Sequence, residues 1–335
     1  MEAYTFITLT LNPAVDTSGE VEQFEPTHKL RCRDVRREPG GGGINVARVL
    51  NRLGAQALAV FPVGGAIGGL LQNLASAEGL AHVALRMVGE TRENLTVRDA
   101  ATGNQFRFVF PGPELPGRSL DAICAAALAR LQASSWLVIS GSLPDGAPPD
   151  TYQRLVLSAK RTGAHIAIDA AGEPLRLAFS ASPDLVKISA RELSDLTGVA
   201  LHTNQDCVAA ARMLIDQGAR LVAVSWGDRG GLLVSDKDAI AAAAPPVIPR
   251  TTIGAGDSFF AALTWALAGG HGPSDALAHA VAAGSAALLA PGTGLCSAAD
   301  VERLRACVRV VPVVDNQQAP VAAPDQQRLL VGTAS

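Results

Sequence analysis

The sequence is poor in aromatic and charged residues, and it carries no large excess of either charge. Aromatic residues make up 4% of the 335 residues and charged residues 18%, whereas hydrophobic residues make up 48%. A disordered chain would be poor in apolar residues, so disorder is excluded. The formal net charge of −3 supplies no basic field that would favour a nucleic-acid partner. Because Ala and Gly carry much of the apolar count, we expect a core in which helices pack closely on a sheet.

The sequence also lacks cysteine pairs and long hydrophobic runs. Five widely spaced cysteines without a Cys-x-x-Cys pair argue against a disulfide framework or a zinc site. No apolar run reaches the roughly 20 residues that span a bilayer, and residues 276–290 are interpreted as a buried helix. The first residues show no basic segment leading into an apolar one, so no secretory signal is expected. We therefore expect a cytoplasmic protein without a membrane partner.

Short β-rich runs alternate with longer runs rich in Ala and Leu. The strand-like runs are continuously apolar, as expected for strands that are buried on both faces. This alternation predicts an α/β fold, a doubly wound and mostly parallel sheet whose ligands bind beyond the carboxyl ends of the strands. The expected strands are 4–11, 57–61, 136–140, 165–169, 185–188 and 221–225, and the expected helices are 44–53, 120–131, 149–162 and 205–217.

Two more polar regions, residues 14–37 and 91–111, interrupt this alternation. Both show period-two patterning without helix signals, and a hairpin is expected within 96–110. We predict that they form a small antiparallel sheet, inserted as a lid into one domain that spans residues 1–311. Residues 312–335 have no periodicity and are predicted to be a mobile tail.

The strongest functional pattern is Thr-Thr-Ile-Gly-Ala-Gly-Asp-Ser at residues 251–258, ahead of an Ala-rich helix. Small residues at a helix start leave backbone N–H groups accessible to an anion. Asp257 then places a carboxylate beside that anion pocket, which suits phosphoryl transfer to a hydroxyl. Two alternatives remain open: Asp257 only complements the helix dipole, or Ser258 is the nucleophile of a Gly-Asp-Ser esterase.

A second pattern is the run Pro-Gly-Gly-Gly-Gly-Ile-Asn-Val-Ala at residues 39–47. Four glycines before a helix allow a ligand to approach the backbone closely. The run is not a Walker A loop, since no Lys-Ser/Thr follows, and Asn45 occupies the place of the third glycine of a dinucleotide fingerprint. The alternative is a flexible connection.

A third pattern is a set of cations at period two, Lys29, Arg31 and Arg33. On a strand, these three side chains would project from one face, and Arg92 could join them to bind a phosphate dianion. The alternative is a charged edge strand that deters aggregation. Asp16 follows the first expected strand and is a candidate ligand for sugar hydroxyls, or a turn residue.

Residues 40–47 and 252–258 together resemble the two signatures of the PfkB (ribokinase-like) carbohydrate kinases, and the resemblance extends from about Thr5 to Arg309. Within that family, stretches 29–32, 38–48, 61–65, 107–112 and 139–144 are most similar to the bacterial ATP-dependent 6-phosphofructokinase branch. The related 1-phosphofructokinases and tagatose-6-phosphate kinases usually carry a lysine in the glycine run, where this chain has only glycines. Residues 10–16 fit 1-phosphofructokinases equally well, so these two activities stay open.

The resemblance implies a role for each matching residue. Asp257 would be the base, with an anion hole formed by Gly254, Ala255 and Gly256. The sugar hydroxyls would be held by Asp16, Gly40, Gly41, Gly42 and Asn45. The existing phosphate of the substrate would be bound by Lys29, Arg31, Arg92 and Ser142, with the first two reaching in from a second subunit of a homodimer that pairs through its lids. The nucleotide site would comprise Lys187, Ser189, Ser225, Gly227, Gly230, Thr252 and Gly284.

The implied cofactors are ATP and Mg²⁺, with Glu192 acting on the metal indirectly. A K⁺ site is implied near Thr251, Ile253, Ala287 and Gly292. One departure is Ser189, because the family has an Asn there, and Ser offers one donor instead of two.

The expected function is phosphorylation of fructose 6-phosphate at its C1 hydroxyl, a step of glycolysis. Fructose 1-phosphate and tagatose 6-phosphate are the alternative substrates, and a sugar-phosphate sensor without activity is a remote alternative that Ser189 alone supports.

Overall fold

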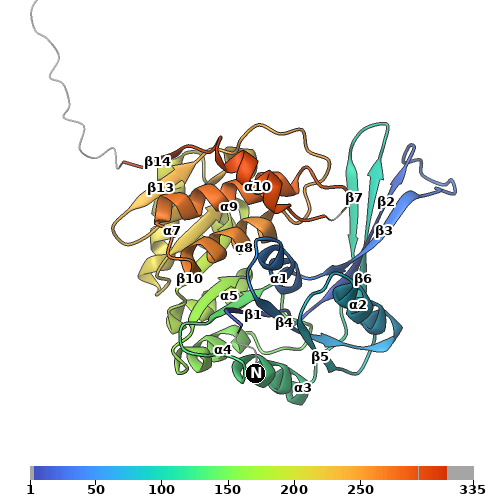
Figure 1. Ribbon diagram of the computed structural model, residues 1–335, viewed down its shortest axis with the longest axis horizontal. Coiled ribbons are helices and arrows are strands. Elements are labelled where there is room, and N and C mark those ends of the chain that lie inside the picture. Colours follow the sequence, from blue (N-terminus) through green and yellow to red (C-terminus); the bar gives the residue numbers. More distant parts are fainter. Residues whose placement is uncertain (1–3, 293, 315–335) are drawn as a thin grey trace, which may run out of the picture.

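The computed structural model describes residues 4–292 and 294–314. Its main feature is a ten-stranded sheet, flanked by helices (Figure 1). The parallel strands are β1 (Phe6–Leu9), β4 (Ala57–Val63), β5 (His82–Arg86), β8 (Trp136–Ser140), β9 (His165–Asp169), β10 (Leu185–Ser189) and β11 (Val222–Ser225). Antiparallel strands β12 (Gly231–Val234), β13 (Ala239–Ala242) and β14 (Val310–Pro312) complete one edge, in the order β14-β13-β12-β11-β10-β9-β8-β1-β4-β5.

Helices cover both faces of this sheet, which confirms the predicted fold class. One hydrophobic cluster includes residues of α1 (Gly42–Arg52), α2 (Gly65–Ala77), α8 (Ala255–Ala268), α9 (Pro273–Ala287) and α10 (Ala298–Arg305). A second cluster includes residues of α3 (Gly117–Leu128), α4 (Thr151–Lys160), α5 (Gly172–Ala178), α6 (Ala190–Thr197) and α7 (Asn204–Asp216). Two short 3₁₀ helices lie at Phe179–Ala181 and Gly227–Arg229.

Successive residues of the central strands belong to opposite clusters. Phe6 packs in the first cluster and Ile7 in the second, and Val138 lies in the first cluster between two neighbours of the second. Side chains alternate across a strand, so a strand with helices on both faces must be apolar throughout. This is why six strands could be predicted from short apolar runs.

A four-stranded sheet projects from one side of the molecule (Figure 1). Its order is β3-β2-β6-β7, formed by β3 (Arg33–Gly40), β2 (Ala14–Val21), β6 (Arg92–Asp99) and β7 (Gln105–Val109). The two outer pairs are antiparallel as predicted, but the central pair, β2 with β6, is parallel. Both of these strands lead away from the large sheet and each returns through its own hairpin, so they run side by side in the same direction.

Two further sequence predictions need correction. Lys29 and Arg31 lie in an exposed loop and not on a strand, because Pro26 and a left-handed Thr27 (φ 67°) form a turn and β3 begins only at Arg33. The predicted tail also began too early, since Pro312 pairs with Ile240 in β13. The rest of the tail from residue 315 lies outside the described residues.

Within the described ranges 4–292 and 294–314, no helix combines the length and the hydropathy needed to cross a bilayer.

Candidate active site

A cleft of about 550 Å³ lies between the two sheets, at the carboxyl ends of β8 and β9. This is the edge of an open α/β sheet where ligands bind. The cleft brings together residues from sites that are far apart in the chain: Asp16, Gly41, Gly42, Asn45, Arg92, Asn94, Arg107, Ser140, Gly141, Ser142, Leu143, Tyr152, Asp169, Ala170, Ala171, Pro174, Glu192 and Asp257. Eight of the residues singled out from the sequence are therefore in one place.

Asp257 lies in the first turn of α8 and lines the cleft. Its carboxylate accepts a hydrogen bond from Asn45, with 2.8 Å between Nδ2 and Oδ2. Burial raises the pKa of Asp257, while the Asn45 hydrogen bond and the charge of Lys187 oppose part of that shift. The carboxylate thus faces the cleft in a partly desolvated setting, which strengthens it as a proton acceptor for a bound hydroxyl.

The start of α8 is shaped to leave its first amides open. Gly254 is the N-cap in a left-handed conformation (φ 77°), and a Cβ there would lie 2.7 Å from Leu295. A Cβ on Gly256 would lie 3.1 Å from Nζ of Lys187, so that ammonium lies directly against the first turn. Ser258 is fully buried, and its hydroxyl accepts the Cys296 amide, which excludes it as an esterase nucleophile.

Lys187 and Asp169 form a buried ion pair beneath this turn, with 3.0 Å between Nζ and Oδ2. Burial raises the pKa of Asp169 to about 6, although the charge of Lys187 opposes the shift. Burial lowers the pKa of Lys187, but the carboxylates of Asp169, Asp257 and Glu192 outweigh it and raise the pKa overall. Near neutral pH, an ammonium therefore lies beside the position where α8 would hold an anion.

Further carboxylate and amide side chains of the cleft come from the small sheet and α1. Asp16 on β2 accepts a hydrogen bond from Asn94 on β6, with 2.7 Å between Oδ1 and Nδ2. A Cβ on Gly40 would lie 2.3 Å from Oδ2 of Asp16, and one on Gly42 would lie 2.2 Å from Oγ of Ser140. The backbone of the glycine run passes so close to the side chains of Asp16 and Ser140 that only glycine fits there.

Two guanidinium groups lie at the small-sheet side of the cleft. Arg92 starts β6 and donates to the backbone oxygens of Asn12 (3.0 Å) and Phe110 (3.4 Å). Its Nε is buried without a partner in the described structure. Arg107 on β7 also lines the cleft, and Ser142 accepts a hydrogen bond from Asn12. An unpaired guanidinium N–H and a second guanidinium in one cleft suit a phosphate dianion.

A second, shallower cleft of about 470 Å³ adjoins the first at the ends of β10 and β11. It is lined by Ser189, Ala190, Arg191, Ser194, Leu201, Ser225, Trp226, Gly227 and Asp228. The Arg229 guanidinium lies over the Trp226 ring, 4.7 Å from its centroid. This cation–π contact holds the indole in place as an aromatic wall of the cleft. A planar, apolar ring with polar edges fits such a wall.

Ser189 and Glu192 connect the two clefts. They form a capping box on α6, in which Oε2 of Glu192 accepts from both the backbone N–H (2.9 Å) and the hydroxyl (2.6 Å) of Ser189. Glu192 lines the first cleft and Ser189 the second. Together with Asp169, Glu192 supplies carboxylate oxygens, a donor type that fits a divalent metal ion.

The chain matches the family described as pfkB family carbohydrate kinase over residues 8–300. This protein belongs to that family. It is 39% identical over 301 residues to the ATP-dependent 6-phosphofructokinase isozyme 2 of Escherichia coli K12, covering 89% of this chain and 97% of the relative. It is 34% identical to the 1-phosphofructokinase of Xanthomonas campestris, covering 78% of this chain and 83% of the relative. A crystal structure of phosphofructokinase-2 from Escherichia coli in complex with substrates and products matches with a TM-score of 0.86 at 38% identity, covering 90% of this chain and 98% of that one.

Several candidate site residues that the sequence predicted lie outside both clefts of this kinase. Lys29 and Arg31 are exposed at the far end of the small sheet and line neither cleft. Gly230 ends a turn with φ 91°, and a Cβ there would clash with the oxygen of Ala242, so the backbone and its packing both require glycine. Gly284 faces the backbone of Ala255 across α8 and α9. The Thr252 amide donates to Gln105 on β7.

The segments predicted to bind K⁺ lie together in this kinase. The amide of Thr251 donates to the oxygen of Leu288, the residue after Ala287. Gly292 lies against the small sheet, since a Cβ there would be 2.7 Å from Oγ of Ser18. Ile253 donates its amide to the Thr251 hydroxyl.

Sequence reasoning missed five polar residues that line the kinase cleft. Asp169 could have been found, because it ends a strand that was predicted correctly. Arg107 alternates with exposed phenylalanines on β7, a pattern that places it on the opposite face. Ser140 carries the same signal as Asp169, because it ends the correctly predicted strand 136–140. Asn94 and Tyr152 gave no sequence signal, since their position depends on tertiary packing.

Proposed function

We propose that this kinase transfers the γ-phosphoryl group of ATP to the C1 hydroxyl of fructose 6-phosphate. The observation that carries the proposal is one cleft that combines a half-buried carboxylate at a helix N-terminus with a pair of guanidinium groups. Asp257 would accept the proton of the attacking hydroxyl. The open amides of Gly254, Ala255 and Gly256, with the Lys187 ammonium, would stabilise the charge that develops on the transferred group.

The two guanidinium groups support a substrate that already carries a phosphate. Arg92 and Arg107 lie on β6 and β7, on the small-sheet side of the cleft. Asp16 accepts a hydrogen bond from Asn94 on β6, Asn45 donates one to Asp257, and all of these residues line the same cleft. A ketose phosphate would thus place its phosphate at one end and a hydroxyl at Asp257. The relatives named as phosphofructokinases favour a fructose phosphate.

The second cleft, beside Trp226, would hold the nucleotide base, with Ser189, Ser225 and Gly227 along its wall. Mg²⁺, when bound by Asp169 and Glu192, would neutralise phosphate charge. Those two residues would keep the nucleotide phosphates between the clefts. K⁺ would bind where residues 251–253 meet 287–292; a related Escherichia coli structure is described as a complex with potassium.

We also propose a homodimer through the small sheet. Its surface exposes large apolar side chains, including Val35, Phe108 and Val109. Lys29 and Arg31 would then reach the cleft of the partner subunit. Phe108→Glu should convert the dimer to a monomer in size-exclusion chromatography with light scattering, whereas Leu157→Glu on α4, equally exposed, should not. A dimer that survives Phe108→Glu, or a monomeric wild type, contradicts this interface.

The substrate proposal is tested with a coupled ADP-release assay containing Mg²⁺ and ATP. Fructose 6-phosphate, fructose 1-phosphate, tagatose 6-phosphate and fructose are compared by kcat/KM. Preference for fructose 6-phosphate supports the proposal and a step in glycolysis that yields fructose 1,6-bisphosphate. Preference for another ketose phosphate overturns the substrate and keeps the mechanism. ADP release with none of them would overturn the kinase activity itself.

A further inference from the structure

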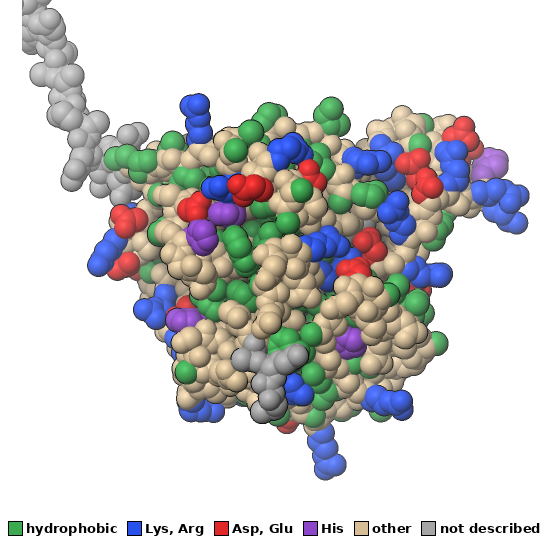
Figure 2. Space-filling view, viewed as in Figure 1, with side chains coloured by type: hydrophobic (Ala, Val, Ile, Leu, Met, Phe, Trp, Pro, Cys, Tyr) green, Lys and Arg blue, Asp and Glu red, His purple; other side chains and the backbone are tan. Residues whose placement is uncertain are grey.

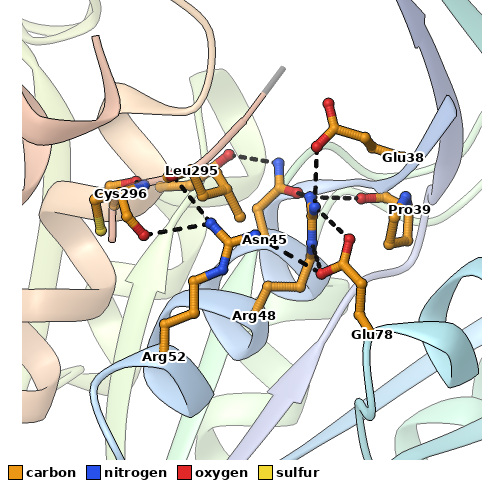
Figure 3. A network of polar contacts seen from close by, with 10 residues as sticks. Glu38, Pro39, Asn45, Arg48, Arg52, Glu78, Leu295 and Cys296 are labelled. Atoms are coloured by element: carbon orange, nitrogen blue, oxygen red, sulfur yellow. Dashed lines mark hydrogen bonds and ion pairs between the residues drawn. The ribbon is translucent and has the colours of Figure 1, made fainter. Parts of the chain in front are cut away.

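Arg48 is the centre of a polar network that the proposed reaction does not yet use (Figure 3). It lies on α1 and is only 3% exposed. Its guanidinium binds Glu78 through two hydrogen bonds (2.7 and 2.6 Å) and Glu38 through one (3.2 Å). Nη1 donates to the backbone oxygen of Pro39 (3.1 Å) and to Oδ1 of Asn45 (3.3 Å).

The contact with Asn45 decides which way its amide points. An Asn side chain has an oxygen that only accepts and a nitrogen that only donates. Because Arg48 occupies the oxygen, the nitrogen is left to face the Asp257 carboxylate at 2.8 Å. With the amide reversed, an oxygen would face the carboxylate and a nitrogen would face the guanidinium, and both contacts would be repulsive.

The same guanidinium reaches the small sheet. Glu38 and Pro39 belong to the end of β3, where the small sheet returns to the glycine run. Figure 3 shows Arg48 between these residues and Asn45. One buried side chain therefore contacts both the end of β3 and the amide that holds the base.

We propose that Arg48 is a positioning residue, which orients the Asn45 amide toward Asp257 and links that orientation to the end of β3. The proposal rests on the proposed function, in which Asp257 is the base. Its effect reaches the reaction only through Asn45. Lys187, Asp16 and Arg107 also act on Asp257, and none of them contacts Arg48 in the hydrogen bonds described above.

The test uses Arg48→Lys, which keeps a cation between Glu38 and Glu78 but cannot supply the same fork of donors. The matched control is Arg52→Lys. Arg52 lies one turn further along α1, donates to the backbone oxygens of Leu295 and Cys296, and has no hydrogen bond to Asn45. Both variants alter packing around α1, so a merely structural role would affect both alike.

The Asn45 hydrogen bond lowers the pKa of Asp257, so loosening it should raise that pKa. We expect the acidic limb of the kcat profile to move up by about half to one pH unit in Arg48→Lys, with kcat at neutral pH falling about twofold to tenfold. Arg52→Lys should leave the limb in place. In an Asn45→Ala background, Arg48→Lys should no longer move it. An unchanged limb in Arg48→Lys, or an equal shift in Arg52→Lys, overturns the proposal.

A second readout does not need turnover. The carboxyl ¹³C resonance of Asp257, assigned with Asp257→Asn, should titrate at higher pH in Arg48→Lys than in wild type. If wild type releases no ADP, the proposed function fails, and this titration still decides the effect of Arg48 on Asp257.

An independent observation lies at the opposite end of α8. His271, Asp275 and His279 each place one candidate metal-binding atom within 4.8 Å of the others. Asp275 and His279 lie four residues apart on α9 and share one face, while His271 precedes the helix and its Nδ1 lies 2.5 Å from Oδ2 of Asp275. Trp265 packs against both imidazoles, with ring centroids 5.6 and 5.2 Å away, and limits their rotation.

Arg305 now supplies the positive charge beside this cluster, with 3.1 Å between Nη1 and Oδ1 of Asp275. It also donates through Nε and Nη2 to Glu302, so it keeps a partner if a cation takes its place at Asp275. Two imidazoles and one carboxylate form a donor set that suits Zn²⁺. We infer that this cluster is a zinc-binding site that joins the α8–α9 turn to α9.

Isothermal titration of the full chain with Zn²⁺ tests this inference. We expect binding that weakens about tenfold or more in the His271→Gln, His279→Gln double variant. His165→Gln is the control, because His165 also packs on a tryptophan but lies outside the cluster. Zinc should raise the Tm of wild type and not that of the double variant. Equal affinity in wild type and the double variant, or no binding by wild type, overturns the site.

Discussion

The large and the small sheet differ in nearly every physical respect. Strands of the large sheet such as β4 and β8 are buried along their whole length. Strand β3 of the small sheet is exposed over its first five residues, and β7 is exposed over its last four. Figure 2 shows the same contrast on the surface, where charged side chains gather on the projecting part of the molecule. The large sheet is thus packed on both faces, and the small sheet exposes charged and apolar side chains.

This difference assigns the proposed chemistry and the proposed substrate recognition to different parts of the molecule. The proposed base and anion hole lie at the start of α8, and the Lys187–Asp169 pair lies on strands of the large sheet, so packing fixes their positions. The two cations proposed to bind the substrate phosphate, Arg92 and Arg107, come from the small sheet. Chemistry and recognition are thus carried by different parts, and mutations in each should affect different kinetic constants.

The largest effect is expected from the large sheet, with Asp257→Asn. Loss of a general base should lower kcat by about 10²- to 10⁴-fold, while KM for the sugar changes little. Steady-state kinetics of ADP release measure this effect. Asp300→Asn is the matched control, because Asp300 is also an acidic residue in the first turn of a helix, α10. Near-full activity of Asp257→Asn in a folded protein would contradict the assignment.

A smaller effect of a different kind is expected from the small sheet, with Arg107→Ala. Losing a charge-assisted contact to phosphate should lower kcat/KM for the phosphorylated sugar about 10- to 100-fold, mainly through KM. Arg98→Ala is the control on the same sheet, since Arg98 pairs with Glu20 and does not line the cleft. A fall in kcat with KM unchanged would place Arg107 in the chemistry instead.

The pH dependence sharpens the description of the large sheet. Burial raises the pKa of both Asp257 and Asp169, the latter to about 6. A base must be deprotonated to accept a proton. Activity should therefore be constant near neutral pH and fall about tenfold per pH unit once the pH drops below the pKa values of these two interacting carboxyl groups. A kcat profile between pH 5 and 8 measures it, and a flat profile down to pH 5 would contradict a buried base.

The smallest effect is expected at Ser189, between the two clefts. Ser189→Ala removes a helix cap, which should lower the free energy of unfolding by about 1 kcal/mol. It also frees Glu192, so the Mg²⁺ concentration for half-maximal activity should rise. Ser189→Asn should keep the cap and serve as the control. Urea unfolding and magnesium titrations measure the two effects, and identical behaviour of all three proteins would show that the cap is irrelevant.

The same contrast explains what could be predicted from the sequence. Strands 136–140 and 165–169 were predicted with their observed bounds, because burial on both faces leaves a strong apolar signal. In the small sheet, exposed residues carry little such signal. Lys29 and Arg31 were therefore placed on a strand that the turn at Thr27 prevents.

For the candidate site too, residues with a strong local sequence signal were predicted and residues placed by tertiary packing were missed. Asp257, Asn45 and the glycine run were identified because local backbone chemistry demands small residues and a carboxylate there. Arg107 and Tyr152 were missed, since only pairing of β6 with β7 and packing of α4 bring them to the cleft. Arg48 lies within the glycine-run helix, yet its four partners come from three separate parts of the chain.

The most direct test of this division is the ratio of kcat/KM for fructose 6-phosphate to kcat/KM for fructose. We expect wild type to favour the phosphorylated sugar by about 100-fold or more, and the Arg92→Ala, Arg107→Ala double variant to lose most of that preference. Turnover of fructose should stay within a few-fold of wild type, because Asp257 and its anion hole are unchanged. A preference that survives the double substitution, or an equal loss with both sugars, would contradict the separation of chemistry from recognition.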